Sequence, residues 1–474
     1  MLPKPQNYSI YPSVVLSGKE TLMTIAANEK AFFFQEGAEY KLLIYGIDND
    51  DSYYTPHSHQ KASIVASNGI LQFPFTFQNE QEYRIVLMKV EEEEKKTLAS
   101  LELYCLKEDL YDLIPLKADF HSHSFRSDGA RDPAAEAGHY REQGYDCFAL
   151  TDHNRFYPGG EIDETYAGVD TEFFRIRGEE VHAPENTIHI VHIGGTESVA
   201  AQYVHNIDGF EREIEENYLP RVPENVPTEF AERYAKSMWV CDKIHEAGGL
   251  AIFPHPFWRP GNNVHNVNSK YARLLLESGL FDAYEVIGGM TKSQNNASVA
   301  LWNDFRADGH KIPIVGSSDV HKLEKSIHFP HQFTVCFAKE RTPEGVVNAI
   351  KEGMSVAVEG IGNEYERFYH VYGNCRMVFY TQFLLKTYFY QMQQIAHGEG
   401  IAMREFAIGR ADKSLVEAFA NQARSYRLQF FGKQSPILPS KEALEWEEKW
   451  RDVQRSGPLT KGSKVSAPPI TMQI

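Results

Sequence analysis

Three segments in the middle of the chain repeat one plan, and this repeat constrains the fold more than any other feature of the sequence. In residues 132–154, 235–258 and 301–322 a helical pattern leads through glycine into a short apolar run, and polar residues follow. A helix that leads through glycine into a buried strand is typical of parallel β/α units. The middle of the chain is therefore expected to be an α/β domain on parallel strands. Ligands of such folds bind beyond the C-terminal ends of the strands.

The regions on either side follow different patterns. Residues 1–115 contain short aromatic and β-branched runs separated by turn residues, which predicts a small antiparallel β-sandwich. Residues 361–455 are expected to be mainly helical, with one long helix over 375–400 and a second over 414–431. The end of the chain, 456–474, is rich in Pro, Gly and Ser and is expected to be disordered.

Composition narrows the class of protein. No run approaches the ~20 consecutive apolar residues of a membrane span. Residues 1–15 lack the layout of a secretory signal, so a cytoplasmic protein without membrane contact is expected. Most of the net charge of −17 lies between residues 116 and 360. An acidic centre repels nucleic acid unless cations are bound there, and bound divalent ions would cancel part of that charge.

Side chains that can bind metal follow the predicted strands of the middle region. They are His121, His123, Asp128, Asp152, His153, Glu179, Glu180, His189, His192, His255, Asp319 and His321. Residues i and i+2 of a strand point to the same side, so the pair at 121 and 123 can reach a common site, as can the pair at 319 and 321. Imidazole together with carboxylate suits Zn, Mn or Fe, and adjacent metals ~3.5–4 Å apart activate water for phosphoryl displacement. A divalent metal site is therefore expected at this face.

The other histidines that we considered do not share this context. His57 and His59 repeat the His-Ser-His tripeptide, but they follow proline in a turn-like stretch without a preceding buried strand. We therefore expect them to lie in a surface loop. Four more histidines are interpreted as structural residues, the first two of them within predicted helices: His139, His245, His310 and His370.

Five motifs of the middle region occur in a defined order. They are "DFHSHSFRSDG" at 119–129, "ALTDHN" at 149–154, "RGEEV" at 177–181 followed by "HIV" at 189–191, "PHPFW" at 254–258 and "GSSDVH" at 316–321. Together they resemble the motif series of the PHP (polymerase and histidinol phosphatase) superfamily over residues 116–358. The resemblance implies a distorted (β/α)7 TIM-like barrel over 116–360. It also implies two or three divalent metal ions (Zn, Mn or Fe) and phosphoesterase activity.

The resemblance further implies a ligand set in three groups. His121 and His123 would bind a first metal with Glu180 and Asp319 bridging or adjoining it, Glu180, His189 and His255 would bind a second, and Asp128, His153 and His321 a third. In the catalytic role that it implies, Glu180 and Asp319 would hold a metal-bridging hydroxide that attacks phosphorus. Such a hydroxide makes a side-chain nucleophile unnecessary.

Two positions in this set have a competing neighbour. Members of the family place the ligand glutamate two residues after glycine, which favours Glu180 over Glu179. A His-Ile-Val strand follows it in the family, which favours His189 over His192. Asp152 precedes a predicted ligand histidine and is expected to orient ligands rather than to bind metal.

Cationic side chains lie beside the ligand motifs, and we expect at least one of them to contact a phosphorylated substrate. A guanidinium fork suits phosphate because it donates two parallel hydrogen bonds, and ammonium binds phosphate as a point charge. The candidates for substrate binding are Arg126, Arg155, Arg259 and Lys322. The sequence does not single out the acid that protonates the leaving group.

The predicted activity is hydrolysis of a phosphate ester in a small phosphorylated substrate, by a phosphatase or a phosphodiesterase. One alternative is a nuclease or nucleotide phosphodiesterase on the same centre, with the slightly basic C-terminal region guiding a strand, although nucleic acid is the less favoured partner. A second alternative is a metal-bearing binding or regulatory module without turnover. A third is metal-assisted hydrolysis of a C–N or C–O bond. The oligomeric state is left open.

Overall fold

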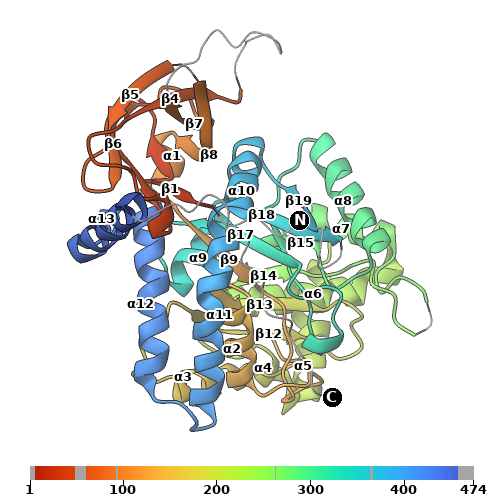
Figure 1. The fold of residues 1–474 in the computed structure, drawn as a ribbon. Coiled ribbons are helices and arrows are strands. Elements are labelled where there is room, and N and C mark those ends of the chain that lie inside the picture. The colour runs from red at the N-terminus through yellow and green to blue at the C-terminus, as the bar shows by residue number, and fades with distance from the viewer. Residues whose placement is uncertain (1–5, 49–59, 92–93, 262, 363–366, 457–474) are drawn as a thin grey trace, which may run out of the picture.

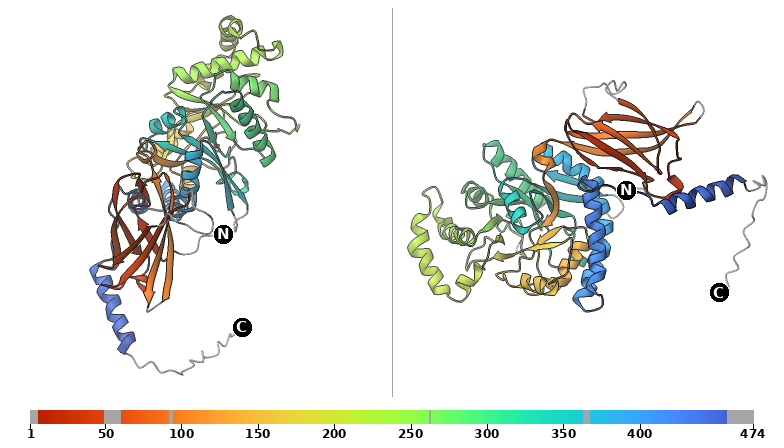
Figure 2. Two further views of the ribbon diagram at one scale, coloured as in Figure 1. Left: turned by 90° about the horizontal axis from the view of Figure 1, so that it is seen from above. Right: turned by 90° about the vertical axis from the view of Figure 1, so that its left-hand side faces the viewer.

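The protein is described from a computed structural model over residues 6–48, 60–91, 94–261, 263–362 and 367–456. Figure 1 shows a β-rich N-terminal part beside a larger α/β body, with the C-terminal helices α11 and α12 standing along one side of that body. In Figure 2 the helices α6 to α8 lie at the end of the body that is remote from the N-terminal part. The loop predicted at His57 and His59 and the tail predicted over 456–474 fall outside the described residues, apart from Ser456.

The N-terminal part consists of two sheets, ordered β1-β3-β6 and β2-β8-β7-β4-β5. Its elements are β1 (Tyr8–Tyr11), β2 (Val14–Leu16), β3 (Glu20–Ala27), η1 (Lys30–Phe32), β4 (Glu39–Gly46), β5 (Gln60–Val65), β6 (Ile70–Thr76), β7 (Gln81–Glu91), β8 (Glu94–Leu106) and α1 (Glu108–Tyr111). Along β4 buried residues alternate with more exposed ones, which is the period of a strand with one face in a core. Both sheets contribute to that core, with Met23 and Ile25 from β3 and Leu42 and Ile44 from β4.

The α/β body is built on two further sheets, ordered β11-β10-β9-β17-β18-β19 and β12-β13-β14-β15-β16. The strands are β9 (Ile114–Asp119), β10 (Cys147–Ala149), β11 (Phe174–Ile176), β12 (Gly178–Val181), β13 (Ile190–Gly194), β14 (Gly249–Phe253), β15 (Ala283–Ile287), β16 (Ile314–Gly316), β17 (Gln332–Ala338), β18 (Ser355–Gly362) and β19 (Arg367–Tyr372). Both sheets contribute side chains to one apolar cluster, which includes Ala118, Val191, Ile252, Val315 and Cys336. The body is thus an α/β fold with a half-barrel sheet. Among the described strands, the pairing does not complete a (β/α)7 barrel.

The expectation of parallel strands holds for part of the body only. Strands β9, β10 and β11 are parallel, as are β14, β15 and β16. Strand β13, however, runs antiparallel to both of its neighbours, and β17 runs antiparallel to β9. For β13 the reason is its short connection to β12, because two strands joined by a short loop form an antiparallel hairpin, whereas a parallel pair needs a long crossover.

Helices connect and cover these strands. They are α2 (Pro133–Glu142), α3 (Pro158–Thr165), α4 (Ala200–Val204), α5 (Ile207–Glu213), α6 (Ala231–Glu246), α7 (Ser269–Glu277), α8 (Lys292–Ala307) and α9 (Pro343–Lys351), with the short turns η2 (Ile214–Tyr218), η3 (Leu219–Arg221), η4 (Thr228–Phe230) and η5 (Leu323–Lys325). After β19 come α10 (Cys375–Lys386), α11 (Tyr388–Ala407), α12 (Lys413–Phe430) and α13 (Lys441–Ser456). No helix in the described ranges is long and apolar enough to cross a membrane.

The prediction of one long helix over 375–400 is wrong, because α10 ends at Lys386 and a separate helix, α11, begins at Tyr388. Thr387 at the junction has φ −117° and ψ −77°, which lies outside helical values. Helix α11 then packs against α2 of the body, and a buried ion pair joins the two helices. Arg141 Nε lies 2.6 Å from Glu399 Oε2, and neither side chain is exposed.

Polar contacts attach the N-terminal part to α10. Arg376, in the first turn of α10, donates to both carboxylate oxygens of Asp109 and to both of Glu80. Lys386, at the end of the same helix, donates to Glu82 at 2.7 Å. Helix α10 therefore contacts the N-terminal sheet region at both of its ends.

Candidate metal centre

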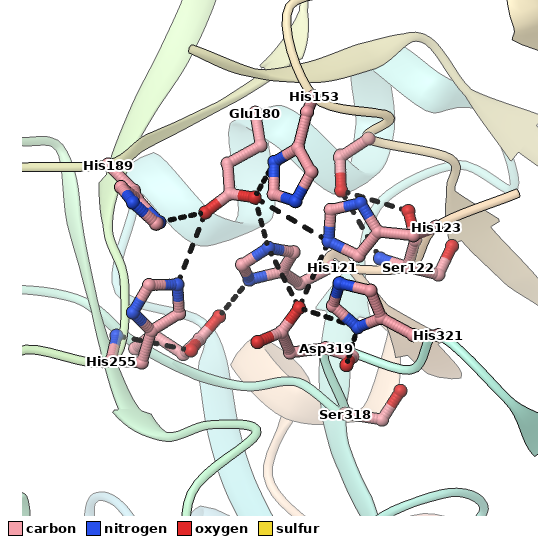
Figure 3. Close-up of polar contacts among 12 residues, drawn as sticks. His121, Ser122, His123, His153, Glu180, His189, His255, Ser318, Asp319 and His321 are labelled. Atoms are coloured by element: carbon pink, nitrogen blue, oxygen red, sulfur yellow. Dashed lines mark hydrogen bonds and ion pairs between the residues drawn. The ribbon is translucent and has the colours of Figure 1, made fainter. Parts of the chain in front are cut away.

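The nine predicted metal ligands converge on one region of the body. Figure 3 labels all of them except Asp128. His121 and His123 lie just after β9, and His153 lies in the loop after β10. Glu180 is in β12, whereas His255 follows β14 and Asp319 follows β16. Isolated bridges of backbone hydrogen bonds connect Ser122 with Val320 and His153 with Glu180. Segments from both sheets of the body are therefore fixed to one another at this site.

The Glu180 carboxylate is at the centre of the cluster and lies close to six imidazoles. Its Oε2 is 3.3 Å from His121 Nε2, 3.5 Å from His123 Nε2, 2.7 Å from His153 Nδ1 and 3.5 Å from His182 Nε2, and its Oε1 is 2.9 Å from His189 Nδ1 and 3.2 Å from His255 Nε2. Burial raises the pKa of Glu180, but the neighbouring His121 and His189 lower it by more, so its pKa lies well below the ordinary value. The side chain is therefore a buried carboxylate anion among nitrogen donors.

Asp319 is a second carboxylate on the opposite side of His121 and His123. Its Oδ1 lies 3.0 Å from His123 Nε2 and 3.4 Å from His121 Nε2. The Asp319 backbone has a φ of 49°, a left-handed conformation that is uncommon for residues other than glycine. Gly289 leaves the space that this side chain needs, since a Cβ at that position would lie 2.3 Å from Asp319 Cβ.

Asp128 forms the outer part of the cluster with two further histidines. Its Oδ2 is 3.4 Å from His153 Nε2 and 3.3 Å from His321 Nε2. About half of the Asp128 side chain is exposed, and the two histidines are only partly buried. This group therefore lies nearer to solvent than the group around Glu180.

The pKa values show how the cluster balances its own charge. Burial lowers the pKa of His123 and of His189 to about 4, so both imidazoles are neutral lone-pair donors at neutral pH. Burial also lowers the pKa of His153, but the nearby carboxylates of Asp128 and Glu180 raise it by more, to about 10. His153 thus carries a proton that compensates the nearby carboxylates. A bound cation would supply the same compensation.

The residues fit divalent metal ions on two observations of the structure. Six buried polar atoms of the cluster have no hydrogen-bond partner in good geometry: His121 Nε2, His123 Nδ1, His153 Nδ1, Glu180 Oε2, His182 Nε2 and His255 Nδ1. The possible ligand atoms also fall into four groups within 4.8 Å: His123, Asp128, His153 and His321; His121, His123 and Asp319; His121, Glu180 and His255; His153, Glu180 and His182. Nitrogen and carboxylate donors at this density are the ligands of borderline divalent ions. The cluster is therefore a candidate metal site.

The hairpin of β12 and β13 places Glu180 and His189 at the cluster, and Glu179 and His192 on the opposite face. Side chains alternate along a strand, so Glu179 and Glu180 point to opposite faces. Glu179 pairs in register with His192, and its Oε1 lies 3.5 Å from His192 Nδ1 on the face away from the cluster. Because β13 runs antiparallel to β12, it begins at the end of the hairpin where the cluster lies. His189, just before β13, therefore reaches Glu180. Glu179 instead accepts hydrogen bonds from the Ser198 hydroxyl and from backbone N–H groups of the following helix.

Two residues of the site were missed in the sequence. His182 stands two positions after Glu180, which is the same-side spacing of a strand, and its ring stacks on His189 with centroids 3.7 Å apart. Glu285 lies in β15, where its carboxylate is 3.1 Å from His121 Nδ1. A charged residue in the otherwise apolar run "AYEVI" was the signal that could have revealed it.

Asp152 holds the loop that follows the first two histidines by accepting hydrogen bonds from it. Its Oδ1 accepts from the Ser124 N–H at 2.8 Å and from the Ser127 hydroxyl at 2.6 Å. Asp119 has a similar structural role, since it accepts from the N–H groups of His121 and Ser318. Burial raises the pKa of Asp119 to about 6.

The four cationic candidates for substrate binding differ in availability. Arg126 forms a bidentate pair with Glu161, at 2.7 and 3.0 Å, and stacks on the ring of Phe125. Its guanidinium is thus occupied within the protein. The three remaining candidates are exposed and lie within four positions of a predicted ligand in the chain: Arg155, Arg259 and Lys322.

The sequence matches no protein-family model and no curated protein. Among solved structures, a two-domain protein from Bacteroides vulgatus that contains a predicted PHP-like metal-dependent phosphoesterase is 17% identical over 56% of this chain and 77% of that chain, with a TM-score of 0.35. A candidate metal-dependent phosphoesterase from Bifidobacterium adolescentis is 16% identical over 43% of this chain and 87% of that chain, with a TM-score of 0.31. An amidohydrolase from Chromobacterium violaceum, with bound sulfate and no metal, is 19% identical over 44% and 89%, with a TM-score of 0.31.

Proposed function

We propose that the chain is a metal-dependent phosphoesterase that hydrolyses a phosphate ester in a small phosphorylated substrate. The observation that carries the proposal is the Glu180 carboxylate, buried and within 3.5 Å of six imidazole nitrogens. A carboxylate with a histidine environment of this kind suits two adjacent divalent ions, and the motif series that contains these residues resembles that of the PHP superfamily. We also infer that the two sheets of the body belong to one distorted (β/α)7 barrel.

The residues would divide into three sets of ligands. His121, His123 and Asp319 would hold one cation, and Glu180 would reach both this cation and a second one held with His189 and His255. Asp128, His153 and His321 would hold a third, near solvent. His182 adds a nitrogen donor beside Glu180 that was absent from the predicted set.

Divalent cations bound here would acidify a water molecule and offset the charge of the phosphate oxygens. Glu180 and Asp319 would orient that water, because they lie on either side of the His121 Nε2 atom, at 3.3 and 3.4 Å from it. Burial of both histidines at 121 and 123 excludes bulk water from the inner part of the centre. Arg155, Arg259 and Lys322 are the exposed cations that would contact the phosphate from the rim.

The test is a hydrolysis assay on protein loaded with Mn or Zn, with metal content measured on the same samples. The panel contains a generic aryl phosphate, sugar phosphates, nucleotides and a short oligonucleotide. We expect turnover of a phosphomonoester or a small phosphodiester, lost in Asp319→Asn and in His321→Ala. His310→Ala is the matched histidine control, because His310 stacks on Phe305 away from the cluster.

Each alternative gives a different result in this assay. Metal binding without hydrolysis of any phosphoester would overturn the proposal in favour of a binding or regulatory module. Preference for the oligonucleotide would favour a nuclease. Hydrolysis of amide or other carbon-centred substrates alone would show that the centre cleaves C–N or C–O bonds instead.

A further inference from the structure

Glu285 is a buried carboxylate in the middle of a buried strand. All five residues of β15 are buried, and Glu285 is the charged one among them. Burying a carboxylate is unfavourable unless hydrogen-bond donors or charges compensate it. The contacts of its two oxygens therefore indicate why this residue stands in the strand.

Both oxygens contact predicted metal ligands. Oε2 lies 3.1 Å from His121 Nδ1, and Oε1 accepts from the backbone N–H of His255 at 3.3 Å. His255 has a φ of 26°, an unusual backbone conformation for a residue with a side chain. Glu285 thus connects ligands that come from two different strands, His121 after β9 and His255 after β14.

Gly288 keeps the space for this carboxylate. A Cβ built at Gly288 would lie 2.0 Å from Glu285 Oε1, closer than any side chain tolerates. The Gly288 N–H donates to Asn295 at 3.0 Å, so the backbone is also fixed at this point. The strand therefore provides the carboxylate, and the residue directly after it leaves the space that the carboxylate needs.

The contact with Glu285 determines which nitrogen of His121 faces the metal site. A carboxylate can only accept, so Nδ1 of His121 carries the hydrogen, and in the neutral ring the lone pair is then on Nε2. His121 Nε2 is buried without a hydrogen-bond partner in good geometry and points between Glu180 and Asp319. Acceptors of this kind on metal-binding histidines fix the ring and raise its basicity.

We propose that Glu285 is a positioning residue of the metal centre, which holds His121 in the tautomer with a free Nε2 and keeps His255 in place. The proposal rests on the metal centre of the proposed function and not on the reaction catalysed there. It predicts an effect on metal affinity that is independent of turnover. It also predicts that Gly288 matters only through the position of the carboxylate.

The test measures metal affinity by competition with a chelator in Glu285→Ala, Glu285→Gln and Gly288→Ala. Glu285→Ala is expected to weaken binding by about 10–100-fold, the range for residues that support a ligand histidine. Glu285→Gln retains an amide oxygen that can accept from Nδ1, so it is expected to recover part of the loss. Glu136→Gln is the matched control, a buried carboxyl in α2.

The tautomer is a second readout that a merely structural role would not change. Nitrogen NMR of histidine-labelled protein loaded with Zn should show the hydrogen of His121 on Nδ1 in the wild type and a mixture of both nitrogens in Glu285→Ala. Gly288→Ala keeps the glutamate and should reproduce the loss of affinity, which covers the case in which Glu285→Ala does not fold.

The outcomes separate this proposal from the proposed function. Wild-type affinity and an unchanged tautomer in Glu285→Ala and Gly288→Ala would overturn the positioning role alone. A wild-type chain that binds no divalent metal would overturn the metal centre and this proposal with it. Reduced affinity in a chain that hydrolyses no phosphoester would support the positioning role and overturn only the reaction.

Discussion

The substitution Glu180→Gln removes the charge of the central carboxylate while keeping its size. In the wild type both oxygens of Glu180 lie between imidazoles, and the side chain is fully buried. The amide of glutamine presents one oxygen and one NH₂ group, so one of the two sets of contacts loses its anionic acceptor. Any cation that Glu180 binds would lose a ligand charge at the same time.

The magnitude follows from the charge that is lost. Two unit charges about 4 Å apart interact by about 4 kcal/mol at an effective dielectric constant of about 20. Since about 1.4 kcal/mol corresponds to a factor of ten, about 4 kcal/mol for each unit of cation charge corresponds to about 1,000-fold, and the loss in affinity for a divalent cation is expected to be at least this large. The Glu180 oxygens lie 2.7 to 3.5 Å from the imidazole nitrogens. A cation bound by Glu180 together with these nitrogens would therefore lie within the distance of about 4 Å used above.

The assay compares metal content after gel filtration, and affinity by chelator competition, in the wild type, Glu180→Gln and Glu179→Gln. Glu179→Gln is the matched control because Glu179 is also buried but faces His192 on the other side of β12. We expect Glu179→Gln to keep wild-type metal content. Wild-type stoichiometry and affinity in Glu180→Gln would refute the reasoning, since the central carboxylate would then be no ligand.

Three further predictions concern stability. Arg141→Met leaves the buried Glu399 carboxylate without its partner and should lower the free energy of unfolding by about 3–5 kcal/mol in urea titrations; a change below 1 kcal/mol would contradict a buried pair. Burial raises the pKa of Glu136 well above its usual value, so the folded state retains a proton that the unfolded state loses, and stability falls as pH rises above about 4.5. Glu136→Gln should therefore raise the melting temperature at pH 8 more than at pH 5, and equal shifts at both values would disprove this. Removing metal with a chelator should lower the melting temperature, because a ligand at about 1,000 times its Kd stabilises the folded state by about 4 kcal/mol; an unchanged melting curve would mean that no tightly bound metal was present.

Most residues of the candidate site that sequence reasoning found follow strands, whereas Glu180 lies within β12 and His189 just before β13. A helical pattern that leads through glycine into a buried run predicted the strands that precede His153, His255 and Asp319. The carboxyl ends of parallel strands meet at one face, and this brought the three residues together. The choice of His189 over His192 came from a family pattern. The structure gives its physical reason, because the antiparallel β13 starts at the site and alternation turns His192 to the other face.

Other features required three-dimensional information. Strand direction in the β12–β13 hairpin depends on how the loop turns, and the apolar pattern of β13 is the same for both directions. Glu285 sits inside a buried strand, so its role depends on an imidazole 164 positions earlier in the chain. The break at Thr387 interrupts an apolar pattern that continues on both sides, and therefore no composition signal marks it.

The most direct test of the metal centre is anomalous X-ray diffraction from crystals of the protein prepared with Mn or Zn, at the absorption edge of the metal. We predict at least two anomalous peaks about 3.5–4 Å apart, with Glu180 between them and His121, His189 and His255 among the ligands. A crystal soaked in the metal that shows an ordered cluster and no anomalous peak within reach of Glu180 would contradict the account.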